Sequence, residues 1–221
     1  MNERGLFIVL EGVDNSGKTT QSKMLVDYLV AQHIPVVNTR EPGGAAVSEE
    51  IRQILVKDRP DMLDPITQTL LFYAARKEFL KTIVYPHLEK GITVISDRFE
   101  ASTFVYQGLV QGVSVGLLDV LHHQVVSNGP DLTFVLNISA DESIRREANQ
   151  DNQGQLQVFE KQGYEFREKL CRGYTEYFHN QREVHSDKNI FLISGNQSKE
   201  VVHSDIGYIT QRYLRRSATN G

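Results

Sequence analysis

The 221-residue sequence contains a single cysteine, Cys171. No disulfide can therefore form within the chain, and a cysteine-based metal site is not indicated. The sequence also lacks an excess of positive charge, because 24 Lys and Arg residues stand against 28 Asp and Glu residues, for a formal net charge of −4. Such a chain has no basic field for the backbone of a nucleic acid. We expect no nucleic acid polymer among its partners, although a local pocket for one nucleotide remains compatible with this charge.

Long hydrophobic runs are also missing. The run Phe7–Leu10 has the length of a strand, whereas a signal peptide needs a longer apolar region after a basic start. No run approaches the roughly 18 apolar residues of a membrane span. Hydrophobic residues make up 40% of the chain and charged residues 24%, as in an ordinary soluble globular protein. We expect a cytoplasmic protein that has no membrane partner.

The most informative stretch is Gly12-x-x-x-x-Gly17-Lys18-Thr19, which follows an apolar run and precedes a helical pattern. A buried strand, a Gly-rich turn and a helix N-terminus, in this order, are what a phosphate-binding P-loop requires. Lys18 adds a positive charge for the outer phosphates, and the Thr19 hydroxyl suits Mg²⁺. A Gly-rich turn that binds nothing is the alternative, and the complete motif argues against it. The residues expected to bind the nucleotide, ATP, are Gly12, Val13, Asp14, Asn15, Ser16, Gly17, Lys18, Thr19 and Thr20.

Apolar strands alternate with helical patterns along the whole chain, which predicts a parallel sheet covered on both faces. Strands are expected at 6–10, 34–37, 91–97, 132–136 and 190–193. Helices are expected at 17–32, 48–55, 66–90 with a bend near Pro86, 101–107, 115–127, 141–148, 158–179 and 198–214. We predict an α/β fold of the P-loop NTPase type: one three-layer domain over residues 1–214, with a five-stranded parallel sheet between helices. The polar segment 149–157 is a candidate lid, and 215–221 is expected to be a flexible tail.

Asp97 and Arg98 follow the third predicted strand and can take part in phosphoryl transfer. Asp97 is placed like the second acid of P-loop enzymes, so Thr19 and Asp97 are the expected metal ligands. A helix cap or a salt bridge to Arg98 is the alternative role for Asp97. Arg98 is a candidate for bridging the donor and acceptor phosphates, although buried arginines often pair with structural carboxylates.

Several motifs together resemble those of thymidylate kinases (dTMP kinases), which are P-loop nucleoside monophosphate kinases. The resemblance runs in one order from about residue 5 to 212, and the central motifs are specific to this family. The matching stretches are Phe7–Gln21, Thr39–Gly44, Leu70–Arg76, Ser96–Phe99, Ser102–Gly108, Pro130–Leu136 and Ile193–Gln197.

This resemblance implies that ATP and dTMP react to give ADP and dTDP, with Mg²⁺ and in a homodimer. It implies that Phe72 stacks on the thymine ring and that Arg76 binds a thymine carbonyl. Their spacing of four puts both on one helix face, although without the resemblance a core residue and a surface charge would be the better interpretation. Arg40, Glu41 and Arg52 are weaker candidates near the acceptor phosphate. The expected dTMP-binding residues are Asp14, Arg40, Arg52, Phe72, Arg76, Arg98, Ser102, Thr103, Tyr106 and Gln107.

The resemblance also assigns roles around the sugar. Ser102, Thr103 and Tyr106 match positions that contact the base and crowd the sugar, which favours a deoxyribose. Asp14 matches the acid that meets the 3′-hydroxyl or organises the metal.

The sequence departs from the family pattern in its arginines. The P-loop has Asn15 where some relatives have arginine, and the segment 149–157 contains no Arg or Lys. Arg145 and Arg146, just before this segment, are the nearest candidates for charge on the transferring phosphoryl group, and Arg167 lies further on. Losing an arginine finger could lower turnover by ~10³–10⁵. The expected catalytic residues are Lys18, Asp97, Arg98, Asp14, Arg145 and Arg146.

Three alternatives remain at this point. The first is a P-loop kinase for another nucleoside monophosphate or for a nucleoside, which a substrate panel would separate from a dTMP kinase. The second is a regulatory GTPase, which would normally need an Asn-Lys-x-Asp sequence that is absent here. The third is a weakly active nucleotide-binding relative of the kinases.

Overall fold

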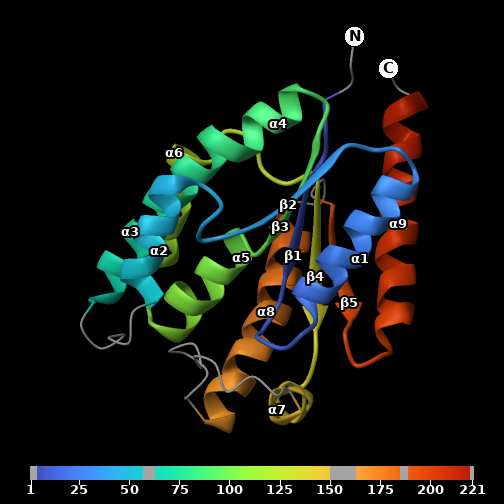
Figure 1. Ribbon diagram of the computed structural model, residues 1–221. Coiled ribbons are helices and arrows are strands. Elements are labelled where there is room, and N and C mark those ends of the chain that lie inside the picture. Colours follow the sequence, from blue (N-terminus) through green and yellow to red (C-terminus); the bar gives the residue numbers. More distant parts are fainter. Residues whose placement is uncertain (1–3, 57–62, 150–162, 185–188, 220–221) are drawn as a thin grey trace.

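The computed structural model describes residues 4–56, 63–149, 163–184 and 189–219 (Figure 1). A five-stranded sheet lies at its centre, with the strand order β2-β3-β1-β4-β5. Every neighbouring pair of strands is parallel. The strands are β1 (Phe7–Glu11), β2 (Val36–Arg40), β3 (Thr93–Asp97), β4 (Leu132–Asn137) and β5 (Ile190–Ser194). The predicted three-layer α/β fold is confirmed.

Helices cover both faces of the sheet (Figure 1). Side chains alternate along a strand, so Ile8 and Leu10 of β1 join the core beneath α1 and α9, whereas Phe7 and Val9 join the core on the opposite face. This burial on both faces explains why β1 is continuously apolar. The helices are α1 (Lys18–Ala31), α2 (Ala46–Val56), α3 (Pro65–Phe79), α4 (Tyr85–Glu89), α5 (Glu100–Thr103), α6 (Val115–Val125), α7 (Ala140–Ala148), α8 (Tyr164–Val184) and α9 (Lys199–Thr219), with π-helical η2 (Leu80–Val84) and η3 (Phe104–Val110).

β2 (Val36–Arg40) lies later in the chain than the strand predicted at 34–37. It pairs only with β3, at the edge of the sheet, where Arg40 lies opposite Asp97. An edge strand tolerates polar residues because one of its sides faces solvent. Beyond the strand, the Glu41 backbone N–H donates to the Asp97 carbonyl at 3.0 Å. This register brings the Arg40–Glu41 segment beside the end of β3.

The predicted helix over 66–90 is formed by α3, η2 and α4 in succession. The π-helical turn precedes Pro86, which has no N–H to continue the α-helical hydrogen bonds. At the C-terminus, α9 continues to Thr219, so the predicted end at Leu214 is wrong and residues 215–219 are helical. The candidate lid lies outside the described residues except for Asn149. None of the described helices has the length and apolar character needed to cross a membrane.

Candidate active site

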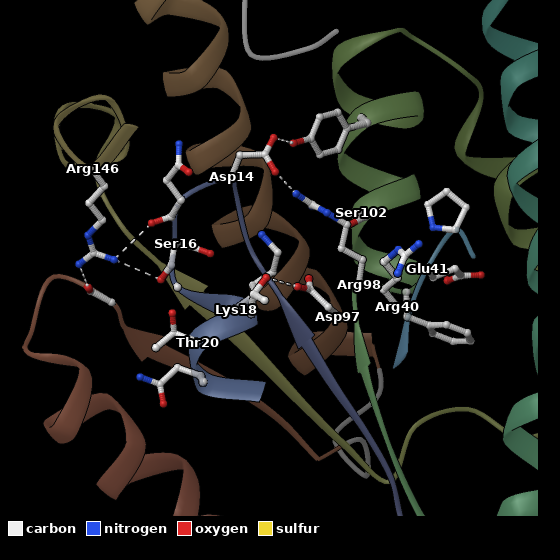
Figure 2. Close-up of a pocket in the computed structure, with 18 of the residues that line it drawn as sticks. Asp14, Ser16, Lys18, Thr20, Arg40, Glu41, Asp97, Arg98, Ser102 and Arg146 are labelled. Atoms are coloured by element: carbon white, nitrogen blue, oxygen red, sulfur yellow. Dashed lines mark hydrogen bonds and ion pairs between the residues drawn. The ribbon is translucent and has the colours of Figure 1, made fainter. Parts of the chain in front are cut away.

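A cavity of about 970 Å³ opens at the carboxyl ends of the strands (Figure 2), where ligands bind in open α/β sheets. Its wall includes the P-loop and the first turn of α1, the turn after β2, and residues of α2, α3, α5, η3 and α7. It also includes the turn after β5 and the start of α9. Nearly all of the predicted site residues therefore meet at one place. The exceptions are Arg145 and the pair Gly12 and Val13, whose carbonyl oxygens accept hydrogen bonds from Lys18 of the cavity wall.

The P-loop bends sharply around the N-terminus of α1. Gly12 has φ 139° and Gly17 has φ 100°, in the region that disfavours a side chain. A Cβ atom at Gly12 would lie 2.5 Å from the Leu136 carbonyl oxygen. Gly17 caps α1 with no side-chain hydrogen bond, so the first N–H groups of the helix remain available to an anion.

Lys18 is buried inside this loop. Its Nζ donates to the carbonyl oxygens of Gly12 at 3.0 Å and Val13 at 2.8 Å. Burial lowers the pKa of Lys18 to about 8, and the positive charge of Arg98 acts in the same direction. A negative group that enters the cavity therefore stabilises the charged form of Lys18.

Thr19 and Asp97 form a pair of oxygen ligands beside the P-loop. The Thr19 hydroxyl donates to Asp97 Oδ2 at 2.7 Å. Among the described residues, no group of three or more His, Cys, Asp or Glu could hold a metal ion. Mg²⁺ usually takes only one or two protein ligands and completes its shell with phosphate oxygens and water, so this pair fits Mg²⁺ bound together with a nucleotide.

Arg98 lies near the P-loop lysine, since both donate to the Gly12 carbonyl, and it pairs with Asp14, not with Asp97 (Figure 2). Its backbone has φ 76°, and its Nη1 donates to the Gly12 carbonyl at 3.1 Å. Burial works to raise the pKa of Asp14, but the charges of Arg98 and Lys18 outweigh it and lower the pKa below its usual value. Asp14 is thus a charged acceptor at the cavity wall, and the Tyr106 hydroxyl donates to it at 3.3 Å.

Arg76 and Glu41 form a buried ion pair in the opposite part of the cavity. Arg76 Nη2 donates to the Phe99 carbonyl and the Thr103 hydroxyl, each at 2.9 Å. Arg76 Nη1 is buried and has no hydrogen-bond partner among the described residues. Glu41, predicted near an acceptor phosphate, is instead occupied by Arg76, and burial raises its pKa to about 7 although Arg76 acts to lower it. A buried donor left unpaired is costly, so Arg76 Nη1 marks a position for a ligand acceptor.

The other predicted ligand residues surround these two pairs. Phe72 lines the cavity one helical turn before Arg76 and is half-buried. Arg40 pairs with Glu49 at 3.0 Å, and Arg52 donates to the Pro42 carbonyl at 2.9 Å. The remaining cavity residues on this side are Ser102, Thr103, Tyr106 and Gln107.

The neighbouring arginines of α7 have different surroundings. Arg146 lines the cavity and donates to the carbonyl oxygens of Asn15 and Ser16, both at 3.3 Å. The Arg145 side chain is 65% exposed and pairs with Glu142, away from the cavity. Consecutive helix residues point about 100° apart, so only one of the two can reach the P-loop. Arg167 also lies outside the cavity wall, where it donates to the Ser143 hydroxyl.

The cavity has two ends with different chemistry. One end offers the N–H groups, lysine and hydroxyl–carboxylate pair that suit a nucleotide phosphate chain. The other end offers the Phe72 ring, the Arg76 Nη1 donor and the charged Asp14 carboxylate. These groups suit a small polar acceptor. A fold and a site of this kind define a P-loop kinase that acts on a small molecule.

Comparison with known proteins narrows this class. The thymidylate kinase family model matches residues 10–206. The thymidylate kinase of Marinomonas sp. is 38% identical over 204 residues, which cover 92% of this chain and 92% of that protein. That of Ruegeria pomeroyi is 36% identical over 221 residues, covering 98% and 100%. The crystal structure of thymidylate kinase from Ehrlichia chaffeensis has a TM-score of 0.72 and 30% identity, and covers 94% of this chain and 99% of that one. The chain belongs to the thymidylate kinase family.

Proposed function

We propose that this protein transfers the terminal phosphoryl group of ATP to dTMP and releases ADP and dTDP, in the supply of dTTP for DNA replication. Membership of the thymidylate kinase family supports this reaction. The observation that carries it in the structure is the cavity that joins the P-loop to the unpaired Nη1 of Arg76. A cytoplasmic location is part of the proposal.

At the donor end, the first N–H groups of α1 and the Lys18 ammonium bind the phosphates of ATP. Thr19 and Asp97 hold Mg²⁺ together with phosphate oxygens. When bound there, Mg²⁺ would supply positive charge to offset the charge that develops during transfer. Arg146 adds positive charge beside the loop and keeps its carbonyls in place.

At the acceptor end, Phe72 stacks on the thymine ring and Arg76 Nη1 donates to a thymine carbonyl. Asp14, held ionised by Arg98, accepts a hydrogen bond from the 3′-hydroxyl of the sugar. Ser102, Thr103, Tyr106 and Gln107 complete the wall around the base and sugar. The residues proposed to hold the dTMP phosphate are Arg40, Arg52 and Arg98.

Catalysis then depends on positioning and on charge. Arg98 contacts the P-loop through Asp14 and the Gly12 carbonyl and lines the cavity beside Ser102, so we propose that it serves both substrates. We propose Lys18, Asp97, Arg98, Asp14 and Arg146 as the catalytic residues. The surroundings of Arg145 give it no such role.

We also propose that the protein is a homodimer that associates through α2, α3 and α6. These helices lie side by side at the edge of the molecule (Figure 1) and contact each other through α3. Each presents apolar side chains to solvent: Val47 and Ile54, Ile66 and Leu70, and Val115 and Val120, respectively. A second copy of the chain is the occupant that would cover this face symmetrically.

Analytical ultracentrifugation tests the dimer. Val120→Lys should shift a dimer to monomer, because it places a charge among apolar side chains. Val201→Lys, at another exposed valine on α9 across the molecule (44% exposed, against 60% for Val120), should leave the dimer intact. A wild-type monomer at micromolar concentration contradicts this part of the proposal.

The reaction is tested by a coupled ADP-release assay with ATP, Mg²⁺ and a panel of nucleoside monophosphates. Selective turnover of dTMP is expected, with dUMP weaker and ribonucleotides silent. Turnover of a different monophosphate overturns the proposal, and tight dTMP binding without turnover supports a weakly active relative. A Lys18→Ala protein prepared in the same way controls for contaminating kinases.

A further inference from the structure

Behind the cavity wall, Arg98 is joined to Glu11 through two hydroxyl groups. Arg98 Nη1 donates to the Tyr174 hydroxyl at 3.0 Å, and the Tyr174 hydroxyl lies 2.9 Å from Ser102 Oγ. Ser102 Oγ donates to Glu11 Oε2 at 2.7 Å. Tyr174 and Glu11 are buried and neither lines the cavity, so neither can contact a substrate there directly.

The hydrogen bonds that link Arg98 to Glu11 all run in one direction. A guanidinium has donors only, so the Tyr174 oxygen accepts from Arg98. Ser102 gives its one hydroxyl hydrogen to Glu11, so the Tyr174 hydroxyl donates to Ser102 Oγ. The hydrogen bonds therefore run from the positive charge of Arg98 to the carboxylate of Glu11, and Ser102 Oγ also accepts directly from Arg98 Nη1 at 3.1 Å.

Glu11 also holds the backbone that carries Arg98. Its Oε1 accepts from the backbone N–H groups of Phe99 at 2.7 Å and Ser102 at 3.2 Å. Glu11 ends β1, directly before the P-loop, whereas Phe99 and Ser102 begin the segment that follows β3. One carboxylate thus fixes the P-loop strand, the start of α5 and the hydroxyl chain relative to each other.

Tyr174 brings α8 into the same arrangement. On the side away from Tyr174, the Arg98 guanidinium pairs with Asp14 of the P-loop. The guanidinium is therefore held from the cavity side by Asp14 and from the buried side by Tyr174. The Gly12 carbonyl and Ser102 Oγ also accept from Nη1, each at 3.1 Å, and the Tyr174 hydroxyl at 3.0 Å is the shortest of the three Nη1 contacts.

We propose that Tyr174 and Glu11 are positioning residues for Arg98, which direct its guanidinium at the phosphate of the acceptor without touching the substrate. This inference rests on the proposed function, in which Arg98 binds the dTMP phosphate. A merely structural role for Tyr174 predicts loss of fold stability and a loss of affinity for every ligand alike. A positioning role predicts a loss confined to ligands that carry the phosphate.

Tyr174→Phe is the central variant, because it removes the hydroxyl and keeps the ring. Isothermal titration calorimetry gives the Kd for dTMP and for thymidine, which lacks the phosphate. We expect the dTMP Kd to rise about tenfold, as for the loss of one hydrogen bond to a charged group, with the thymidine Kd unchanged. An equal rise for both ligands, or no rise for either, overturns the inference.

Tyr177→Phe is the matched control. Tyr177 lies on the same helix, is buried in the same core as Tyr174 and loses the same atom. In the described part of the chain, its hydroxyl makes no hydrogen bond to Arg98 or Ser102. This variant should change neither Kd, and thermal unfolding of both variants separates effects on stability from effects on binding.

A double-mutant cycle tests whether the effect passes through Arg98. In an Arg98→Ala background, Tyr174→Phe should cause no further loss of dTMP affinity, because the guanidinium that it positions is absent. A further tenfold loss means that Tyr174 acts by another route, which overturns the inference. Glu11→Gln should reproduce the selective loss of dTMP affinity, since an amide brings a donor into a site where all partners donate. If that protein does not fold, the Tyr174 measurements decide.

Failure of the positioning role can be distinguished from failure of the proposed function. A wild-type protein that neither binds nor phosphorylates dTMP contradicts the proposed function itself. A wild-type protein that does both, with a Tyr174→Phe variant that binds dTMP normally, leaves the function intact and removes only the positioning role.

Discussion

Arg76 Nε donates to both carboxylate oxygens of Glu41, at 2.8 and 3.0 Å, and the two side chains are 1% and 3% exposed. A buried ion pair adds little net stability, because its desolvation cost offsets the attraction. Its effect here is to fix orientation, since the Nη2 donors are used by Phe99 and Thr103. Only Nη1 is left for a ligand.

Glu41→Gln should therefore weaken dTMP binding, although Glu41 does not contact the substrate itself. It holds Arg76, which is proposed to donate to a thymine carbonyl. The KM for dTMP should rise several-fold with a smaller change in kcat. The free energy of unfolding should fall by about 3 kcal/mol, because the Arg76 charge loses its partner. Steady-state kinetics and urea unfolding measure both effects. Glu50→Gln, at an exposed carboxylate outside the cavity, is the control, and an unchanged KM for Glu41→Gln would contradict the assignment.

Lys18→Ala should nearly abolish turnover and leave the Kd for dTMP largely intact. The lysine lies within the P-loop, where it serves the donor phosphates, and loss of one such preorganised charge costs about 10²–10³ in kcat. Lys23→Ala, at an exposed lysine of the same helix, should keep full activity. A parallel loss of dTMP affinity in Lys18→Ala would mean that the lysine serves the acceptor as well.

The P-loop could be located from sequence because all of its determinants are consecutive. The strand, the two glycines, Lys18 and Thr19 lie within one short stretch, and their geometry is set by local backbone requirements. The pairing of Thr19 with Asp97 was also within reach, since β1 and β3 end at the same edge of the sheet.

Contacts across long sequence separations were not predictable. Nothing in the apolar context of Tyr174 indicates that its hydroxyl meets Arg98, and Glu11 looks like the end of a buried strand. β2 was placed too early because its strand pattern is weak at the edge of the sheet, where packing on β3 decides its register. The Arg76–Glu41 pair depends on that same register, so the sequence alone does not predict it.

Nucleotide binding should be coupled to proton uptake near pH 8. In the free protein, burial lowers the pKa of Lys18 from 10.5 to about 8, so between these values the unfolded chain binds more protons than the native protein. The contribution of Lys18 to the free energy of unfolding therefore rises with pH across that window. Bound phosphates favour the ammonium and raise the pKa again.

At pH 8, the complex should take up about half a proton per nucleotide. The Lys18 contribution, taken as the difference between wild type and Lys18→Ala, should vanish near pH 6, where Lys18 is already protonated in the free protein and the ADP phosphate itself titrates. Calorimetry of ADP binding in two buffers with different ionisation enthalpies measures the uptake. Lys18→Ala is the control and should show none at pH 8. Equal uptake in that variant would assign the proton to another group.

Arg146→Ala and Arg145→Ala should differ sharply although the residues are neighbours on α7. Both arginines pair with Glu142, but Arg146 also donates to the Asn15 and Ser16 carbonyls and lines the cavity, whereas the Arg145 side chain is 65% exposed and lies outside the cavity wall. A solvent-exposed pair of this kind contributes little to stability, so Arg145→Ala should leave kcat and stability near wild type. It is thus a matched control on the same helix.

In Arg146→Ala, the P-loop loses two hydrogen bonds from a charged donor and the donor end loses a positive charge. The kcat should fall by about 10–100-fold, while the Kd for dTMP stays near the wild-type value because Arg146 contacts the P-loop and not the acceptor pocket. Steady-state kinetics with saturating dTMP, together with direct dTMP titration, separates the two effects. Because the segment 149–157 contains no Arg or Lys, Arg146 is the α7 side chain best placed to supply the missing charge. If kcat fell in Arg145→Ala and not in Arg146→Ala, then α7 would have to turn its exposed arginine toward the phosphates during the reaction.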